Sequence, residues 1–247
     1  MAIHDFKSQR LFVEPDLAQG KAFEASREQA NYLLNVLRLA DGSEVLVFNG
    51  RDGEWRAQIK VQGRKKCQLE PMKLTREQPE PPKLVYCFAP LKQARLDYMI
   101  QKAVEMGVGT LQPVITRFTQ VRTLNQKRIA SNAVEAAEQC GIISLPELRD
   151  TIPLEKLINA LESDSLIFFC DEAASNHTGI SDVSHDKDKP IAIIIGPEGG
   201  FSSDERELIG TWPNVVRLGL GPRILRADTA AVAALALVQA QFGDWHQ

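Results

Sequence analysis

Two uninterrupted apolar runs constrain the fold of this chain more than any other feature. Residues 166–170 read L-I-F-F-C, and residues 191–195 read I-A-I-I-I. A strand with one solvated face alternates apolar and polar residues, whereas continuous apolar runs of this length are typical of strands buried on both faces. The two runs therefore predict an α/β fold, in which helices cover both faces of a mostly parallel sheet.

The region after residue 83 continues this alternation of strand-like and helix-like segments. We expect further strands at residues 84–89, 110–115 and 215–220, and helices at 96–106, 127–140, 203–209 and 228–242. Gly107 and Gly141 directly follow two of these helices, where glycine commonly ends a helix.

A proline-rich segment, E-Q-P-E-P-P-K at residues 77–83, interrupts the chain. We place a linker at residues 76–83, between a domain of residues 1–75 and a domain of residues 84–247. The first domain shows a hairpin pattern at 44–62, another strand at 67–74, and a helix at 26–39 with a capping box at Ser26 and Gln29. These elements predict a small β-barrel.

Composition narrows the classes of function. The four cysteines form no C-x-x-C pair and the four histidines show no metal-ligand spacing, so we expect reduced thiols and no metal. No apolar run reaches the roughly 20 residues of a membrane helix, and the first ten residues lack the apolar core of a secretory signal. We therefore expect a cytoplasmic protein without a membrane partner.

The charges are unevenly distributed along the chain. The formal net charge is −3, yet residues 1–130 hold 21 Lys and Arg against 14 Asp and Glu, whereas residues 131–247 hold 8 against 18. A basic first half can present a cationic face to phosphate although the total charge is negative. A solvated surface without a partner explains the same distribution, so charge alone leaves both interpretations open.

Two glycine-rich segments follow predicted strands of the second domain. G-P-E-G-G begins at Gly196, and G-L-G-P-R-I-L-R begins at Gly219. Ligands of parallel sheets bind beyond the carboxyl ends of the strands, where glycines let the backbone approach a ligand closely. Neither segment has the spacing of a phosphate-binding loop, so a backbone-lined pocket for a nucleoside is the better interpretation.

These segments carry a resemblance to a known family. I-I-G-P-E-G-G-F-S-S-D-E from Ile194 and L-G-L-G-P-R-I-L-R-A-D-T-A-A from Leu218 resemble signatures of the bacterial 16S ribosomal RNA uridine-N3 methyltransferases of the SPOUT superfamily. Supporting matches run from Arg10-Leu11-Phe12 to Ala137-Glu138-Gln139-Cys140-Gly141. Family members usually carry Glu where this chain has Asp228, and many carry Arg where it has Ile142.

The resemblance implies a PUA-like β-barrel joined to a SPOUT domain whose C-terminal part forms a trefoil knot. It also implies a homodimer that binds S-adenosyl-L-methionine and acts on 16S rRNA in the small ribosomal subunit. The helix at 228–242 is a candidate interface element or, equally, a core helix. The cofactor-binding residues implied are Gly196, Glu198, Gly200, Leu218, Leu220, Gly221, Ile224 and Leu225.

Removal of the uridine N3 proton calls for a general base or a cation that stabilises the resulting anion. The candidate catalytic residues are Asp228, as base or orienting group, and Arg226, as stabiliser or phosphate contact. A helix-capping role for Asp228 stays open, as does a purely local hydrogen bond for Glu198. The candidate RNA-binding residues, each also explicable as a solvated charge, are Arg10, Arg38, Lys102 and Arg117.

The sequence leaves two other classes of function to consider. A nicotinamide-dependent oxidoreductase requires a glycine fingerprint after the first strand of the α/β region, where this chain has Ala89-Pro90-Leu91-Lys92. A non-catalytic RNA-binding protein on the same fold would not need the intact segment that starts at Gly219.

Overall fold

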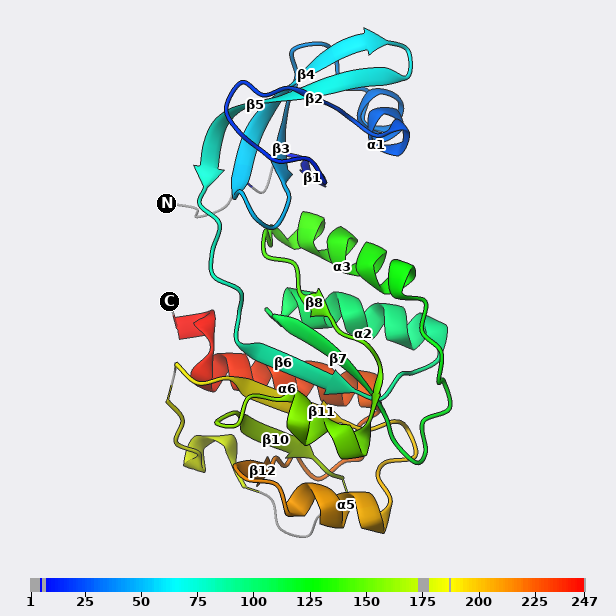
Figure 1. The fold of residues 1–247 in the computed structure, drawn as a ribbon, viewed down its shortest axis with the longest axis vertical. Coiled ribbons are helices and arrows are strands. Elements are labelled where there is room, and N and C mark those ends of the chain that lie inside the picture. The colour runs from blue at the N-terminus through cyan, green and yellow to red at the C-terminus, as the bar shows by residue number, and fades with distance from the viewer. Residues whose placement is uncertain (1–4, 6–7, 173–177, 187, 247) are drawn as a thin grey trace. The chain divides into compact units, whose positions relative to one another are not determined.

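The computed structural model describes residue 5 and residues 8–172, 178–186 and 188–246. The chain forms two compact units (Figure 1). Unit 1 comprises residues 1–80 and 137–145, and unit 2 comprises residues 81–136 and 146–247. The grouping of residues 137–145 with the first unit was not anticipated from the sequence.

Unit 1 is built on a mixed five-stranded sheet with the order β1-β3-β4-β5-β2. Its strand β1 pairs parallel to β3 and the other neighbours pair antiparallel. The predicted hairpin is present as β3 and β4. Strand β5 extends beyond the predicted strand at 67–74 by one residue at its amino end and two at its carboxyl end. The bounds are β1 Arg10–Phe12, β2 Phe23–Glu24, β3 Glu44–Phe48, β4 Glu54–Gly63 and β5 Lys66–Arg76.

The segment predicted as one helix at residues 26–39 forms two shorter, consecutive helices of different type. Ser26 caps α1 (Arg27–Asn31), and the capping box with Gln29 is present in both directions. A π-helix then covers Tyr32–Val36, and Arg38, with φ of 55°, ends the segment in the left-handed region. The sequence pattern located the start of the helix correctly but not the change of its pitch.

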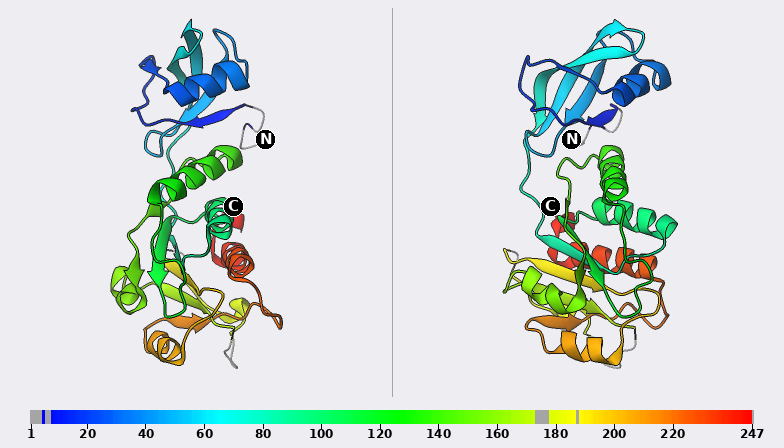
Figure 2. Two further views of the ribbon diagram at one scale, coloured as in Figure 1. Left: turned by 90° about the vertical axis from the view of Figure 1, so that its right-hand side faces the viewer. Right: turned by 45° about the vertical axis from the view of Figure 1, so that its right-hand side comes forward.

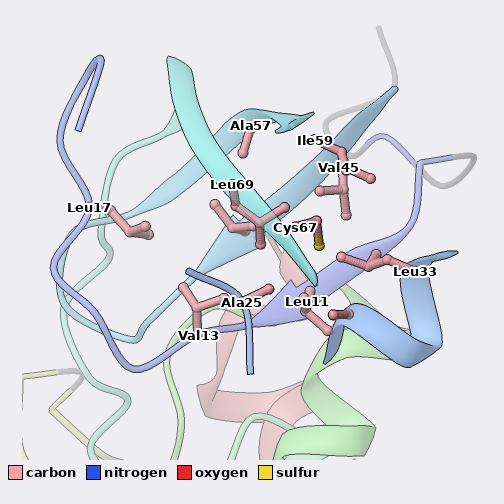
Figure 3. Packing of buried hydrophobic residues seen from close by; sticks show 12 residues of the cluster. Leu11, Val13, Leu17, Ala25, Leu33, Val45, Ala57, Ile59, Cys67 and Leu69 are labelled. Atoms are coloured by element: carbon pink, nitrogen blue, oxygen red, sulfur yellow. The ribbon is translucent and has the colours of Figure 1, made fainter. Parts of the chain in front are cut away.

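The core of unit 1 lies between the curved sheet and α1 (Figure 3). Val45, Ile59, Cys67 and Leu69 come from the strands, and Leu33 from the π-helix closes the cluster. Burial raises the pKa of the Cys67 thiol, so this cysteine behaves as a small apolar core residue.

A buried ionic network ties the first strand to the rest of unit 1. Arg10 Nε donates to Glu54 Oε2 at 2.6 Å, and Arg76 donates to the same carboxylate at 2.8 Å. Glu138 Oε1 accepts the backbone N–H of Phe12 at 2.8 Å, so the end of α3 (Gln126–Cys140) is held against β1. Burial of a charge is tolerable only with such pairing.

Unit 2 contains the predicted parallel sheet. The strand order is β12-β10-β11-β6-β7-β8, with β9 beside β7, and every pairing is parallel. The predicted apolar runs are β10 and β11, each buried at all five positions. The bounds are β6 Leu84–Phe88, β7 Thr110–Ile115, β8 Glu147–Leu148, β9 Ile152–Pro153, β10 Leu166–Cys170, β11 Ile191–Ile195 and β12 Val215–Arg217.

Helices cover both faces of this sheet, as the alternation predicted (Figure 2). On one face α2 (Gln93–Glu105) packs beside α6 (Ala227–Phe242). On the other lie α4 (Leu157–Ala160) and α5 (Ser203–Gly210), whose Leu157 and Ile209 pack in one apolar cluster with strand residues. The α/β class with a mostly parallel sheet is therefore confirmed.

Candidate active site

A cavity of about 400 Å³ lies where β10, β11 and β12 end. The two glycine-rich segments, which follow β11 and β12 in the sequence, both line this cavity. Its lining also includes Cys170 at the end of β10, Asp171 and Glu172 from the loop after it, and the start of α6. Of the expected cofactor-binding residues, the cavity is lined by Gly196, Glu198, Leu218, Leu220, Gly221, Ile224 and Leu225, whereas Gly200 lies beside the Glu172 carboxylate and is not part of the lining.

The first segment is fixed by the helix that follows it. Ser202 caps α5 in a capping box with Glu205, and Glu205 Oε1 also accepts the backbone N–H of Arg117 at 2.7 Å. Gly196 faces the ring of Phe201, where a Cβ would lie 2.6 Å from Cε2. Only glycine fits at position 196 without displacing the ring, because any side chain there would overlap with Phe201.

Glu198 has a partner that the sequence did not reveal. Its Oε1 accepts a hydrogen bond from Arg95 of α2 at 2.5 Å, and both side chains are more than a third exposed. An exposed ion pair of this kind contributes little to folding stability. The pair instead fixes the direction of the Glu198 carboxylate at the edge of the cavity.

Two further carboxylates at the cavity were missed by sequence reasoning. Asp171 and Glu172 follow β10 directly, and Arg206 of α5 reaches both, at 2.8 Å and 3.4 Å. The Asp171 side chain is completely buried. The sequence contains a signal for these two carboxylates. Asp171 and Glu172 directly follow the apolar run 166–170, at the same edge of the sheet as both glycine-rich segments.

The second glycine-rich segment contains both buried and highly exposed apolar residues. Leu218 is buried and forms an isolated parallel bridge with Thr178, whereas Ile224 is 89% exposed. Gly221 has φ of +93°, a conformation that other residues rarely adopt. Ile224 lines the cavity, so its exposed side chain is accessible to a bound ligand.

The candidate catalytic pair lies at the start of α6. Arg226 is the N-cap residue and lines the cavity, and its Nε lies 3.7 Å from Asp228 Oδ1. No side chain caps this helix, so the capping role left open for Asp228 is not seen, although a carboxylate in the first turn favours the helix dipole. Asp228 is half-buried and is not itself part of the lining.

The two buried thiols near the site are unsuited to covalent chemistry. Cys170 lines the cavity, and Cys87 lies on β6. Burial raises the pKa of each thiol to about 12. Both therefore stay protonated at neutral pH, and neither supplies a thiolate nucleophile.

The expected RNA-binding residues differ in solvent exposure and in the ion pairs that they make. Arg38 and Arg117 are exposed. Lys102 contacts Glu105 at 2.6 Å and lies 5.6 Å from the Tyr98 ring centroid. Arg10 is 8% exposed and its Nε lies 2.6 Å from Glu54 Oε2, so it is the least exposed of the four, and its RNA-binding role stays a prediction.

Among the described residues, no group of three or more His, Cys, Asp or Glu side chains is arranged to hold a metal ion. In the part of the chain that the structure covers, every helix is too short or too polar to cross a bilayer.

Family models match both units. The RNA methyltransferase domain matches residues 78–239, and the RNA methyltransferase PUA domain matches residues 26–72. The ribosomal RNA small subunit methyltransferase E of Rickettsia conorii is 32% identical over 94% of this chain and 96% of its own length. The protein of that name from Bacillus subtilis is 27% identical over 94% and 96%.

Solved structures agree in fold over nearly the whole chain. A ribosomal RNA small subunit methyltransferase E from Neisseria gonorrhoeae, bound to S-adenosyl methionine, is 25% identical with a TM-score of 0.85, covering 96% of this chain and 99% of that one. A putative methyltransferase from Legionella pneumophila with bound cofactor SAM is 29% identical with a TM-score of 0.84, covering 95% and 98%. The chain belongs to the ribosomal RNA small subunit methyltransferase E family of RNA methyltransferases.

Proposed function

We propose that this protein transfers the methyl group of S-adenosyl-L-methionine to N3 of a uridine in 16S rRNA of the small ribosomal subunit. The observation that carries the proposal is the single cavity that two glycine-rich segments enclose at the carboxyl edge of the parallel sheet. Ligands of such sheets bind at this edge. We propose a cytoplasmic location for the protein, because it must meet its rRNA substrate.

The residues around the cavity fit the proposed cofactor. Its volume of about 400 Å³ lies in the range of small-molecule sites. Leu218, Leu220, Ile224 and Leu225 offer apolar surface to a nucleobase, and the backbone of the glycine segments offers hydrogen-bonding groups. The carboxylates of Asp171, Glu172 and Glu198 offset the positive charges of a sulfonium and an amino group.

The bound cofactor would supply an activated methyl group, and the protein must orient the base and remove its proton. We propose that Asp228 accepts the N3 proton or orients the base, and that Arg226 stabilises the uridine anion or a neighbouring phosphate. Alignment of the reacting atoms provides much of the rate gain in such a transfer.

Substrate binding is proposed to use the exposed cations Arg38 and Arg117, the partly buried Lys102 and the buried Arg10. The trefoil knot implied by the sequence and a homodimer remain predictions. In α6, Ala231, Leu235 and Val238 are buried within this chain, so an interface on this helix would have to use its other side, where Leu237 is 37% exposed.

The test is incubation of the protein with radiolabelled S-adenosyl-L-methionine and small subunits that lack the modification, followed by mapping of the labelled nucleotide. We expect one labelled uridine carrying an N3-methyl group. The Asp228→Asn variant should bind the cofactor normally but turn over at least tenfold more slowly. A labelled base other than uridine, or label absent from 16S rRNA, would contradict the proposal.

A further inference from the structure

A tyrosine hydroxyl without a hydrogen-bond partner lies in the core of unit 2. Tyr86, in the middle of β6, is fully buried, and its Oη has no partner among the described residues. Its ring stacks on Phe88 at a centroid distance of 5.2 Å, which fixes the direction of the side chain. Buried hydroxyl groups are normally paired, so this one needs an explanation.

Asp228 presents a second polar atom of the same kind. Its Oδ1 is buried and accepts no hydrogen bond from the residues that the structure describes, since Arg226 Nε at 3.7 Å is too distant for one. The exposed part of the side chain, 18%, therefore excludes this oxygen. One oxygen of the candidate base is held away from solvent and the other is not.

Tyr86 and Asp228 lie on the same side of the sheet. Cys87 packs in the apolar cluster with Leu157 of α4 and Ile209 of α5, so its strand neighbour Tyr86 points to the opposite face, which α6 covers. Asp228 precedes Ala231 by three residues and Leu235 by seven, and these buried residues define the side of α6 that packs on the sheet. The Asp228 charge acts on Tyr86, whose pKa is raised well above its usual value first by burial, then by Cys170, Cys87 and Asp228. The phenol therefore stays protonated and can donate.

We propose that the Tyr86 hydroxyl is the positioning group for Asp228, donating to Oδ1 through one bridging water, because the two atoms make no direct hydrogen bond. The donation fixes the rotation of the carboxylate and leaves Oδ2 as the oxygen that meets the uridine N3–H. This inference rests on the proposed function, because it assigns a partner to the base of that reaction. Tyr86 touches neither substrate nor cofactor in this arrangement.

The test is a double-mutant cycle on the full-length protein with Tyr86→Phe and Asp228→Asn. Phenylalanine keeps the ring and its stacking on Phe88 but removes the donor. We expect Y86F to lower kcat by about tenfold, the effect of losing one hydrogen bond to a charged group. The KM for small subunits and the calorimetric Kd for S-adenosyl-L-methionine should not change. In the D228N background, Y86F should have less than a twofold effect.

Ser165→Ala is the matched control. It also removes a buried hydroxyl without a described partner, but Ser165 precedes β10 at the amino edge of the sheet, away from the cavity. We expect this variant to retain the wild-type kcat.

Several results would overturn the inference. They are an unchanged kcat in Y86F, an equal loss in both backgrounds, a weakened cofactor Kd, or loss of the cooperative thermal transition, which would assign the hydroxyl to folding. Absence of methyl transfer by the unmodified protein would instead contradict the proposed function, so the two failures are distinguishable.

Discussion

Substitution of Gly196 by alanine should damage the fold and the cavity together. A Cβ at this position would lie 2.6 Å from Cε2 and 3.0 Å from Cζ of Phe201. Phe201 is 2% exposed and packs edge-on against Phe169 with ring centroids 4.9 Å apart. Because the close-packed core gives the ring no free space, the clash must move the backbone or the ring.

The expected cost follows from this geometry. Overpacking of a core by one methyl group costs about 2 kcal/mol. For a chain of this size, that loss should lower Tm by about 4–8 °C in a thermal melt followed by circular dichroism. The displaced turn should also weaken calorimetric binding of S-adenosyl-L-methionine, since Gly196 lines the cavity.

Two variants test the reasoning. Gly221→Ala meets no atom within 4 Å but must adopt a φ of +93°, so it isolates conformational strain, which costs about 1 kcal/mol. Phe201→Leu removes the clashing ring, so its destabilisation should be less than additive with that of Gly196→Ala. Strict additivity, or a Gly196→Ala protein with unchanged Tm and cofactor Kd, would refute the steric argument.

Two more expectations concern unit 1. Burial alone would raise the pKa of Glu54, but hydrogen bonds from Arg76 and Arg10 outweigh it and lower the pKa below the ordinary 4.5. The stabilisation is therefore present above pH 4.5 and is lost as the pH falls through the folded-state pKa. Glu54→Gln should cost about 3–5 kcal/mol at pH 7 and flatten this acid dependence in urea melts, and a variant as stable as the wild type would contradict the network. Arg38→Gln should reduce the salt dependence of RNA binding by about one unit of slope in filter-binding titrations, and an unchanged slope would remove Arg38 from the interface.

Much of the architecture was predictable from local pattern. The apolar runs 166–170 and 191–195 are buried parallel strands. Their sequences show it because a strand covered on both faces has no solvated side on which polar residues could lie. The Ser26 capping box is present because its hydrogen bonds join residues three apart. The glycine-rich segments identified the edge of the sheet at which the cavity lies.

Other features depend on residues that only the folded chain brings together. The buried pairing of Arg10 with Glu54 joins residues 44 positions apart, and the pairing of Glu198 with Arg95 joins residues 103 apart. Sequence pattern reports the periodicity of one segment and carries no record of which segments meet. Whether Arg10 is a solvated cation or a buried ion-pair partner, and whether the Asp228 carboxylate is exposed or half-buried, was therefore decided by tertiary packing.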